Sequence, residues 1–207
     1  MTQSSPTALV PNHHADYQGF SGIGGLAAGL TMIIGRGAVA RLAADVTAVA
    51  DEDHVVDVGC GPGTAARVAA RRGARVTGVE PASVMLKLAR WLTRRSSPIC
   101  WAEGAAEALP LPDGSATVLW SISAVHHWPD LDGGLAEARR VLAARGRLLA
   151  IERRTRQGAT GLASHGWTDE QGVTFADRCR TAGFVDACVE THRPARKTLL
   201  VVQATAP

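Results

Sequence analysis

The sequence predicts an α/β fold, with a mostly parallel seven-stranded sheet, helices on both faces and a C-terminal antiparallel hairpin. Short apolar runs rich in β-branched residues alternate with segments of helical periodicity, and strands joined by crossover helices run parallel. The last helical segment is followed instead by two short apolar runs around Pro194, which indicates a hairpin.

The first predicted strand, residues 54–58, is the most informative element. It ends in an acid and three closely spaced glycines, in the sequence VVDVGCGPGT. Gly59, Gly61 and Gly63 can adopt positive φ and let a ligand approach the backbone, and a helix follows at once. A nucleotide-like cofactor is expected at this turn.

The remaining elements continue the alternation. Thr168 and Gln171 form a capping-box pattern before a helix that Gly183 ends. Between the second and third strands, an apolar stripe of helical spacing includes Trp91, which is therefore expected to be buried. Further strands are expected at 75–79, 99–102, 116–122 and 147–152, with the hairpin at 184–191 and 199–204.

Length and composition favour one soluble domain. The chain has 207 residues, of which 46% are hydrophobic, and no apolar run is long enough to span a bilayer. A cytoplasmic protein is expected, with a disordered tail over residues 1–12 and a single domain over 13–207. Within that domain, residues 13–50 are expected to form a helical lid that orders over ligand, and residues 51–207 a cofactor-binding core.

Cysteine spacing and charge exclude further classes. Four cysteines without C-x-x-C spacing favour reduced thiols over disulfides or zinc. The net charge of +3 comes largely from arginine clusters, which are read as solvated helix faces because acidic residues nearly balance them. Nucleic-acid binding is thereby disfavoured.

The glycine spacing separates this turn from dinucleotide sites. The pattern is G-x-G-x-G, whereas a pyrophosphate site wants G-x-G-x-x-G, and the turn has no lysine. Glu80, at the tip of the second strand, stands where an acid accepts hydrogen bonds from ribose hydroxyls. A nucleotide-like ligand that carries a ribose but is not held mainly through phosphate is therefore favoured.

With these features in order, the chain resembles the class I S-adenosylmethionine-dependent methyltransferases, in their ubiquinone/menaquinone-type small-molecule branch. The resemblance covers roughly residues 53–204. It implies the Rossmann-like methyltransferase fold, S-adenosyl-L-methionine as cofactor and an enzyme that methylates a small-molecule acceptor. Further ordered matches are AEGAAEALPLPDGS at 102–115, SISAVHHWPD at 121–130, EARRVLAARGRLLAIE at 137–152 and AGFVDACVE at 182–190.

The resemblance also implies the residues of the site. The chain departs from the family at three places. Ala105 stands where an acid often binds the adenine amino group, Thr117 replaces an aspartate at the start of the fourth strand, and residues 144–146 (Ala-Arg-Gly) replace a common Pro-Gly-Gly turn before the fifth strand. The expected cofactor-binding residues are Asp57, Gly59, Gly61, Gly63, Glu80, Pro81, Ala106, Glu107 and Ser123.

His126 and His127 are the candidate catalytic residues, because they follow the fourth strand, where acceptor and methyl group meet in the family. A neutral imidazole there can accept a proton at cellular pH. The alternative, that the pair packs the loop, stays open. His165 could also reach the pocket, but no metal is expected, since carboxylates are scarce near these histidines and no ligand spacing stands out.

Two other functions remain open. The arginine clusters allow an RNA or protein methyltransferase, although no N-P-P-Y or D-P-P-Y motif follows the fourth strand. Ala105 and the altered turns allow a non-catalytic S-adenosylmethionine-binding protein. Whether the chain forms a homodimer is also left open.

Overall fold

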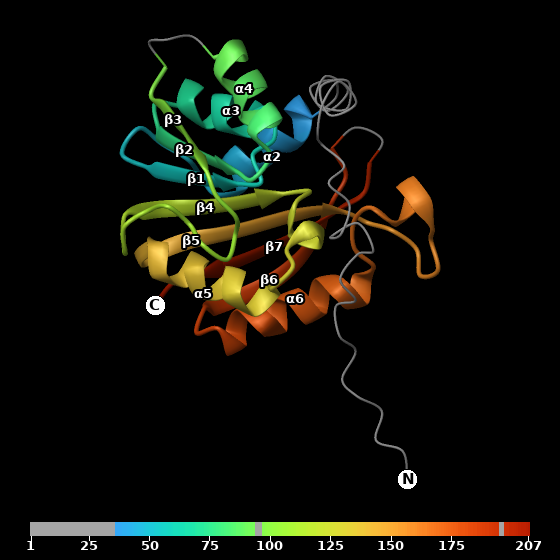
Figure 1. The fold of residues 1–207 in the computed structure, drawn as a ribbon. Coiled ribbons are helices and arrows are strands. Elements are labelled where there is room, and N and C mark those ends of the chain that lie inside the picture. Colours follow the sequence, from blue (N-terminus) through green and yellow to red (C-terminus); the bar gives the residue numbers. More distant parts are fainter. Residues whose placement is uncertain (1–35, 94–96, 195–196) are drawn as a thin grey trace.

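The computed structural model describes residues 36–93, 97–194 and 197–207, which form one seven-stranded sheet in the order β3-β2-β1-β4-β5-β7-β6 (Figure 1). Strands β1 to β5 pair in parallel, and β7 runs antiparallel to both β5 and β6. The predicted fold class is confirmed. The strands are β1 (His54–Val58), β2 (Arg75–Glu80), β3 (Ile99–Glu103), β4 (Ala116–Ile122), β5 (Leu142–Arg153), β6 (Val185–His192) and β7 (Leu199–Thr205).

Helices cover both faces of the sheet (Figure 1). One face carries α2 (Gly37–Val46), α3 (Thr64–Arg71) and α4 (Ser83–Leu92), and the other carries α5 (Leu131–Val141) and α6 (Asp169–Thr181). Two short 3-10 helices, η1 (Val125–His127) and η2 (Gly161–Ser164), lie in the connections after β4 and β5.

The two helical layers explain the continuous apolar run of β1. Val55 packs in the core cluster of α2 and α3, while Val56 packs in the cluster of α5 and α6, and both are fully buried. A strand of a parallel sheet covered on both faces needs apolar residues on both sides. The sheet is therefore held rigidly, and its strand ends are fixed in position.

Local signals placed several elements correctly. Strands β1 and β4 have the expected bounds. Thr168 and Gln171 form both hydrogen bonds of the capping box at the start of α6, and Gly183 follows that helix at φ +88°. Helix α2 ends at Val46, before residue 50 where the predicted helical lid ends, and Ala48 takes φ +46° in the turn after it.

The predicted burial of Trp91 is wrong, since this side chain is 78% exposed. Helix α4 turns Met85, Leu86, Leu88 and Ala89 inward. Because 3.6 residues make one turn, Trp91 falls outside that stripe.

No helix in the described part of the chain is both long enough and apolar enough to cross a membrane. The predicted tail at 1–12 and most of the predicted lid, residues 13–35, lie outside the described residues. Helix α2 is the part of the predicted lid segment that the structure describes, and it packs against α3.

Candidate functional site

The predicted site residues gather where the parallel strands end. The glycine turn follows β1, Glu80 is the last residue of β2, and Ser123 follows β4. Since β1 lies between β2 and β4, these three strand ends are neighbours. Ligands of open α/β sheets bind at the carboxyl ends of the strands, beside the point where strand order reverses.

All three glycines of the turn have positive φ: +71° at Gly59, +52° at Gly61 and +78° at Gly63. A Cβ at Gly59 would lie 2.5 Å from the Cβ of Ala124, and one at Gly63 would overlap the ring of Trp101. A Cβ at Gly61 would meet no described atom within 4 Å. Gly59 and Gly63 therefore allow close packing, whereas Gly61 opens outward, where a ligand can approach the backbone.

Glu80 supports this turn from the tip of β2. Its Oε2 accepts a hydrogen bond from the backbone N–H of Gly61 at 2.9 Å, and its Oε1 accepts one from Ala82 at 3.1 Å. Burial raises the pKa of Glu80, while these two N–H groups lower it. A carboxylate has about four acceptor positions, so about two remain for the hydroxyls of a ligand. Pro81, beside it, is exposed on the rim.

Asp57 lies beneath the turn and is 2% exposed. Its Oδ2 accepts a hydrogen bond of 3.1 Å from the N–H of Ala66, in the first turn of α3. Burial raises the pKa of Asp57 to about 7; the Ala66 N–H lowers it and the charge of Glu80 raises it. The contact with Ala66 ties β1 to the start of the helix that follows the glycines.

The loop after β3 closes another side of the region. Ala106 is buried in the core, and Glu107 accepts a hydrogen bond from the N–H of Asp130 at 3.2 Å, at the start of α5. Ala105 is exposed and pairs with Ala108 across a tight turn. The loop thus has a fixed backbone, and Ala105 offers a ligand no side-chain hydrogen bond.

The segment after β4 brings the two predicted histidines to the same edge. Ser123 takes φ +55° and donates its N–H to the carbonyl of Ile151 at 2.7 Å, which turns the chain into η1. His126 Nδ1 lies 2.8 Å from Oε2 of Glu152, and the two side chains are 7% and 0% exposed. A carboxylate only accepts hydrogen bonds, so Nδ1 is the donor when the imidazole is neutral. Glu152 therefore fixes the orientation and tautomer of His126.

Three buried polar atoms in the described part of the chain have no hydrogen-bond partner, and all belong to this edge. They are Oγ1 of Thr64, Oγ of Ser121 and Nε2 of His126. Thr64 begins α3, and Ser121 is near the end of β4. Since buried polar atoms are almost always hydrogen-bonded, their grouping indicates a surface built to bind something.

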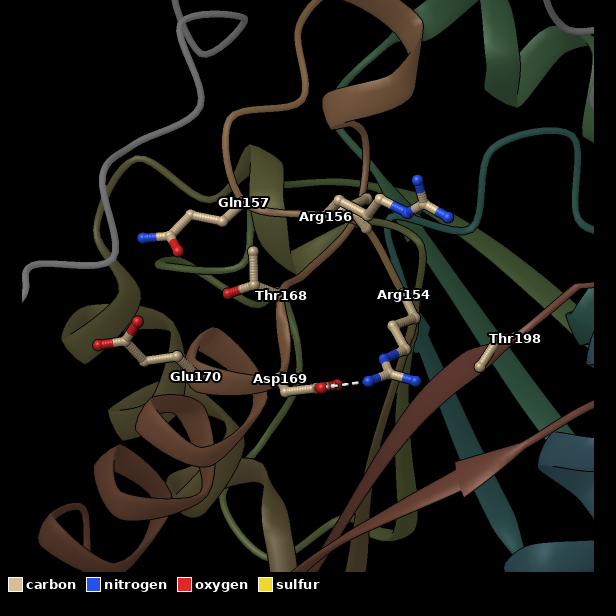
Figure 2. Close-up of a pocket in the computed structure, with 8 residues that line it drawn as sticks. Arg154, Arg156, Gln157, Thr168, Asp169, Glu170 and Thr198 are labelled. Carbon is tan, nitrogen blue, oxygen red and sulfur yellow. Dashed lines mark hydrogen bonds and ion pairs between the residues drawn. The ribbon is translucent and has the colours of Figure 1, made fainter.

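A separate polar cavity of about 610 Å³ lies beside the start of α6, and an ion pair between Arg154 and Asp169 crosses it (Figure 2). It shares no residue with the predicted site, and two of its charged groups, those of Arg154 and Asp169, are already paired with each other. We therefore place the chemistry at the strand ends. The cavity is lined by Arg154, Thr155, Arg156, Gln157, Thr168, Asp169, Glu170 and Thr198.

The sequence does not mark two residues of this region. It predicts only that Glu152 ends a strand, whereas the structure shows that Glu152 is the partner of His126. Arg36 lies where its charge acts on Glu152 and Asp57; burial lowers the pKa of Arg36, and these carboxylates raise it. No sequence motif marks either residue, because both reach the site only through the tertiary fold.

Comparison with known proteins agrees with this architecture. Residues 56–150 match a family model described as a methyltransferase domain. The chain is 35% identical over 112 residues to a demethylmenaquinone methyltransferase of Tropheryma whipplei, a match covering 54% of this chain and 46% of that protein. It is 34% identical over 99 residues to a ubiquinone/menaquinone biosynthesis C-methyltransferase of Rubrivivax gelatinosus, covering 48% and 39%. The matches thus span less than half the length of these relatives.

A solved structure shares the fold over most of the chain. A SAM-dependent methyltransferase from Aquifex aeolicus aligns with a TM-score of 0.72 at 14% identity, covering 87% of this chain and 98% of the other. The family model and these relatives confirm the resemblance that the sequence predicted.

Proposed function

We propose that this chain, whose residues 56–150 match the methyltransferase domain family, binds S-adenosyl-L-methionine at the carboxyl edge of its sheet and transfers the methyl group to a small-molecule acceptor. The observation that carries the proposal is the pairing of Gly61 with Glu80. The backbone nitrogen of Gly61 lies 2.9 Å from Oε2 of Glu80, and the space beside Gly61 is open. The carboxylate of Glu80 can still accept further hydrogen bonds, so a ribose could lie across the turn and donate to it.

The residues present fit the cofactor. Glu80 would accept the ribose hydroxyls, and Gly61 would let the cofactor approach the backbone. Ala106 and Glu107 would lie on the adenine side, where Ala105 supplies no carboxylate, so backbone groups would select the base. Thr64 and Ser121 place unpartnered hydroxyls along the same edge for further polar contacts.

The protein's chemical task is chiefly alignment. The cofactor supplies a methyl group already activated by its positive sulfur. Holding the nucleophile and the methyl carbon in a fixed geometry lowers the activation barrier by about 7 to 11 kcal/mol, which corresponds to an effective molarity of about 10⁵ to 10⁸ M. A single general base contributes less, a rate factor of about 10² to 10⁴. The rigid strand ends of β1, β2 and β4 are suited to holding that geometry.

The acceptor side of the proposal centres on His126, with His127 beside it. Because Glu152 holds Nδ1, Nε2 is the atom of His126 that contacts the acceptor or an ion bound next to it. The names of several relatives refer to quinones or hydroquinones, which supports an aromatic, hydroxyl-bearing acceptor for this chain.

The described arginines give little support to an RNA or protein substrate. Many of the surface arginines pair with nearby acids, which leaves less positive charge for a polyanion. The ion pairs include Arg72–Asp45, Arg140–Asp113, Arg154–Asp169, Arg178–Asp132 and Arg180–Asp177.

Calorimetry tests cofactor binding. We expect the chain to bind S-adenosylmethionine and S-adenosylhomocysteine, and to bind NAD poorly. Glu80→Ala should weaken binding by about 2 to 4 kcal/mol, because each hydrogen bond to a charged group contributes roughly 1.5 to 3 kcal/mol. Glu103→Ala is the matched control, since exposed Glu103 pairs with Glu80 in register at the tip of β3. Clear NAD binding with no response to either adenosyl ligand would overturn the proposal.

An acceptor screen with methyl-labelled cofactor tests activity. Label should move to a hydroxyl-bearing small molecule such as a hydroquinone. Tight cofactor binding without transfer to any acceptor would identify a non-catalytic binding protein, and transfer confined to RNA or protein would replace the small-molecule assignment.

A further inference from the structure

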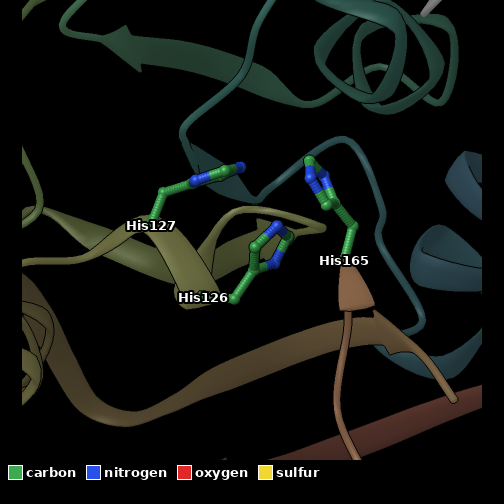
Figure 3. A group of neighbouring side chains, drawn as sticks. All are labelled: His126, His127 and His165. Atoms are coloured by element: carbon green, nitrogen blue, oxygen red, sulfur yellow. The ribbon is translucent and has the colours of Figure 1, made fainter. Parts of the chain in front are cut away.

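Three histidines from two distant segments meet beside the carboxyl edge of the sheet. His126 and His127 lie in η1, and His165 directly follows η2. One ring nitrogen of each lies within 4.8 Å of the other two, and the ring centroids are 4.0, 5.7 and 6.0 Å apart. Figure 3 shows the imidazoles turned toward one another. The fold thus gathers three nitrogen ligands in a small volume.

His126 is held in the way that metal-binding histidines are held. Its Nδ1 contacts the fully buried carboxylate of Glu152 at 2.8 Å. Its Nε2 is buried and has no hydrogen-bond partner among the described residues. A histidine that binds a metal through one nitrogen almost always donates the other N–H to a carboxylate, carbonyl or water. Glu152 supplies this contact and leaves the Nε2 lone pair for a ligand.

The backbone clamps His165 into place. Gly166 has φ +135°, and a Cβ there would overlap the carbonyl oxygen of Arg153. That carbonyl accepts the N–H of Trp167 at 2.9 Å, and Arg153 Nε donates to the carbonyl of His165 at 3.0 Å. These contacts fix the loop to Arg153 at the end of β5, the residue after Glu152. They therefore hold His165 next to His126.

The carboxylate of Glu152 is the negative charge in direct contact with the cluster. Two guanidinium groups also lie in this region: Arg36, whose charge acts on Glu152, and Arg153, whose Nε donates to the carbonyl of His165. A divalent ion on Nε2 of His126 would add positive charge next to Glu152, which is 0% exposed. A buried carboxylate is stabilised by such a partner.

We propose that His126, His127 and His165 bind a divalent transition-metal ion, with Zn²⁺ the best match. Three imidazoles with one position left open are a ligand set of catalytic zinc sites, whereas Mg²⁺ and Ca²⁺ prefer oxygen ligands. Tetrahedral bonds of about 2.0–2.1 Å place the nitrogens about 3.3 Å apart, so binding draws the rings inward by side-chain rotation. The site makes Nε2 of His126 a metal ligand in place of the general base that the sequence predicts.

The role of this ion rests on the proposed function. An acceptor hydroxyl that takes the open position releases its proton to solvent more readily, because a bound metal lowers the pKa of oxygen ligands. The site therefore favours an oxygen nucleophile on the acceptor.

A titration of the chelator-treated 207-residue chain with Co²⁺ alone tests metal binding by its visible absorption. We expect one Co²⁺ per chain in a low-coordinate spectrum, displaced by Zn²⁺. His165→Ala and His127→Ala should weaken binding at least tenfold, and Glu152→Gln about 10- to 100-fold. His192→Ala is the control, because His192 pairs with Glu190 on β6, away from the cluster.

Absence of a Co²⁺ spectrum, or equal Co²⁺ affinity in wild type and His165→Ala, overturns the metal site. Calorimetry with S-adenosylhomocysteine on the same proteins separates this result from the proposed function. Cofactor binding that persists in a chain unable to bind Co²⁺ removes the metal site alone, whereas loss of cofactor binding in wild type removes the proposed function.

Discussion

The two edges of the sheet, where the parallel strands begin and where they end, treat their polar groups in opposite ways. Where they begin, His54 uses both ring nitrogens, one on a backbone carbonyl at 2.6 Å and one on Oγ1 of Thr77 at 2.9 Å. Asp53, 4% exposed, accepts from Oγ1 of Thr117 at 2.6 Å and pairs with Arg147. This edge is a closed hydrogen-bond network.

Where the strands end, the pattern reverses. The three buried polar atoms without partners in the described chain lie there, on Thr64, Ser121 and His126. Burial raises the pKa of both Asp57 and Glu80 at this edge. The same sheet thus satisfies its polar groups at one edge and leaves them partly unsatisfied at the other.

This difference shows where stability and binding are placed. A fully satisfied buried network stabilises and fixes a structure, while an unsatisfied one costs free energy that a ligand can restore. Variants at the closed edge should therefore lower the stability of the fold, and variants at the open edge should chiefly change binding.

The largest expected effect is at the closed edge. Asp53→Ala should lower the free energy of unfolding by about 3 kcal/mol, since it leaves Arg147 and the hydroxyl of Thr117 without their shared partner. Urea denaturation measures this loss. Asp51→Ala, at an exposed neighbour, is the control. A loss below about 1 kcal/mol would show that the network is not what stabilises this edge.

The glycine turn allows the two kinds of effect to be separated within three residues. Gly63→Ala should cost about 2 to 3 kcal/mol of folding stability, from a clash with Trp101 and an unfavourable φ. Gly61→Ala should cost only about 1 to 2 kcal/mol of folding stability, from φ alone. It should nevertheless weaken S-adenosylhomocysteine binding more than Gly63→Ala does. Equal stability losses, or binding unaffected by Gly61→Ala, would contradict the assignment of Gly61 to the ligand.

The pH dependence of stability should expose Asp57. Its pKa rises from 3.8 to about 7 on folding, so between about pH 4 and 7 the folded chain holds a proton that the unfolded chain has lost. The free energy of unfolding should therefore fall as pH rises through that range, and level off above it. Asp57→Asn should flatten the slope. Glu80, whose pKa is also raised, contributes with the same sign and should leave a residual slope. A slope unchanged in Asp57→Asn would show that Asp57 ionises normally.

The smallest effect is expected at Ser121. Its hydroxyl is fully buried without a partner among the described residues, so Ser121→Ala should leave the ligand-free protein equally stable, or more stable by less than about 1 kcal/mol. Denaturation midpoints of the two proteins decide this. A clear loss of stability would mean that the hydroxyl is bonded within the fold.

The sequence predicted the parts of the fold that depend on local patterns. The apolar run of β1, the capping box of Thr168 and the stop at Gly183 each encode their element within a few residues. Trp91 was misplaced because several stripes share the apolar residues of α4, and only the docking of that helix selects Met85 and its neighbours for burial.

The site residues likewise fall into a group that the sequence predicts and a group that only the tertiary fold brings together. Strand-end residues such as Gly61 and Glu80 could be placed together because topology brings the ends of neighbouring parallel strands together. The contacts of His126 with Glu152 and His165 could not be predicted in this way. They join the loop after β4, the end of β5 and the loop that Gly166 allows to pack against β5. Such contacts depend on side-chain packing between segments far apart in sequence.

Hydrogen exchange with and without S-adenosylhomocysteine compares the two edges most directly. The account predicts that saturating ligand slows exchange at the N–H groups of Gly61 and Ala82, which bind Glu80, by a larger factor than at His54, on the closed edge, where only the overall stabilisation of the fold acts. Slower exchange at His54 together with unchanged exchange at Gly61 and Ala82 would contradict the assignment of the ligand to the carboxyl edge of the sheet.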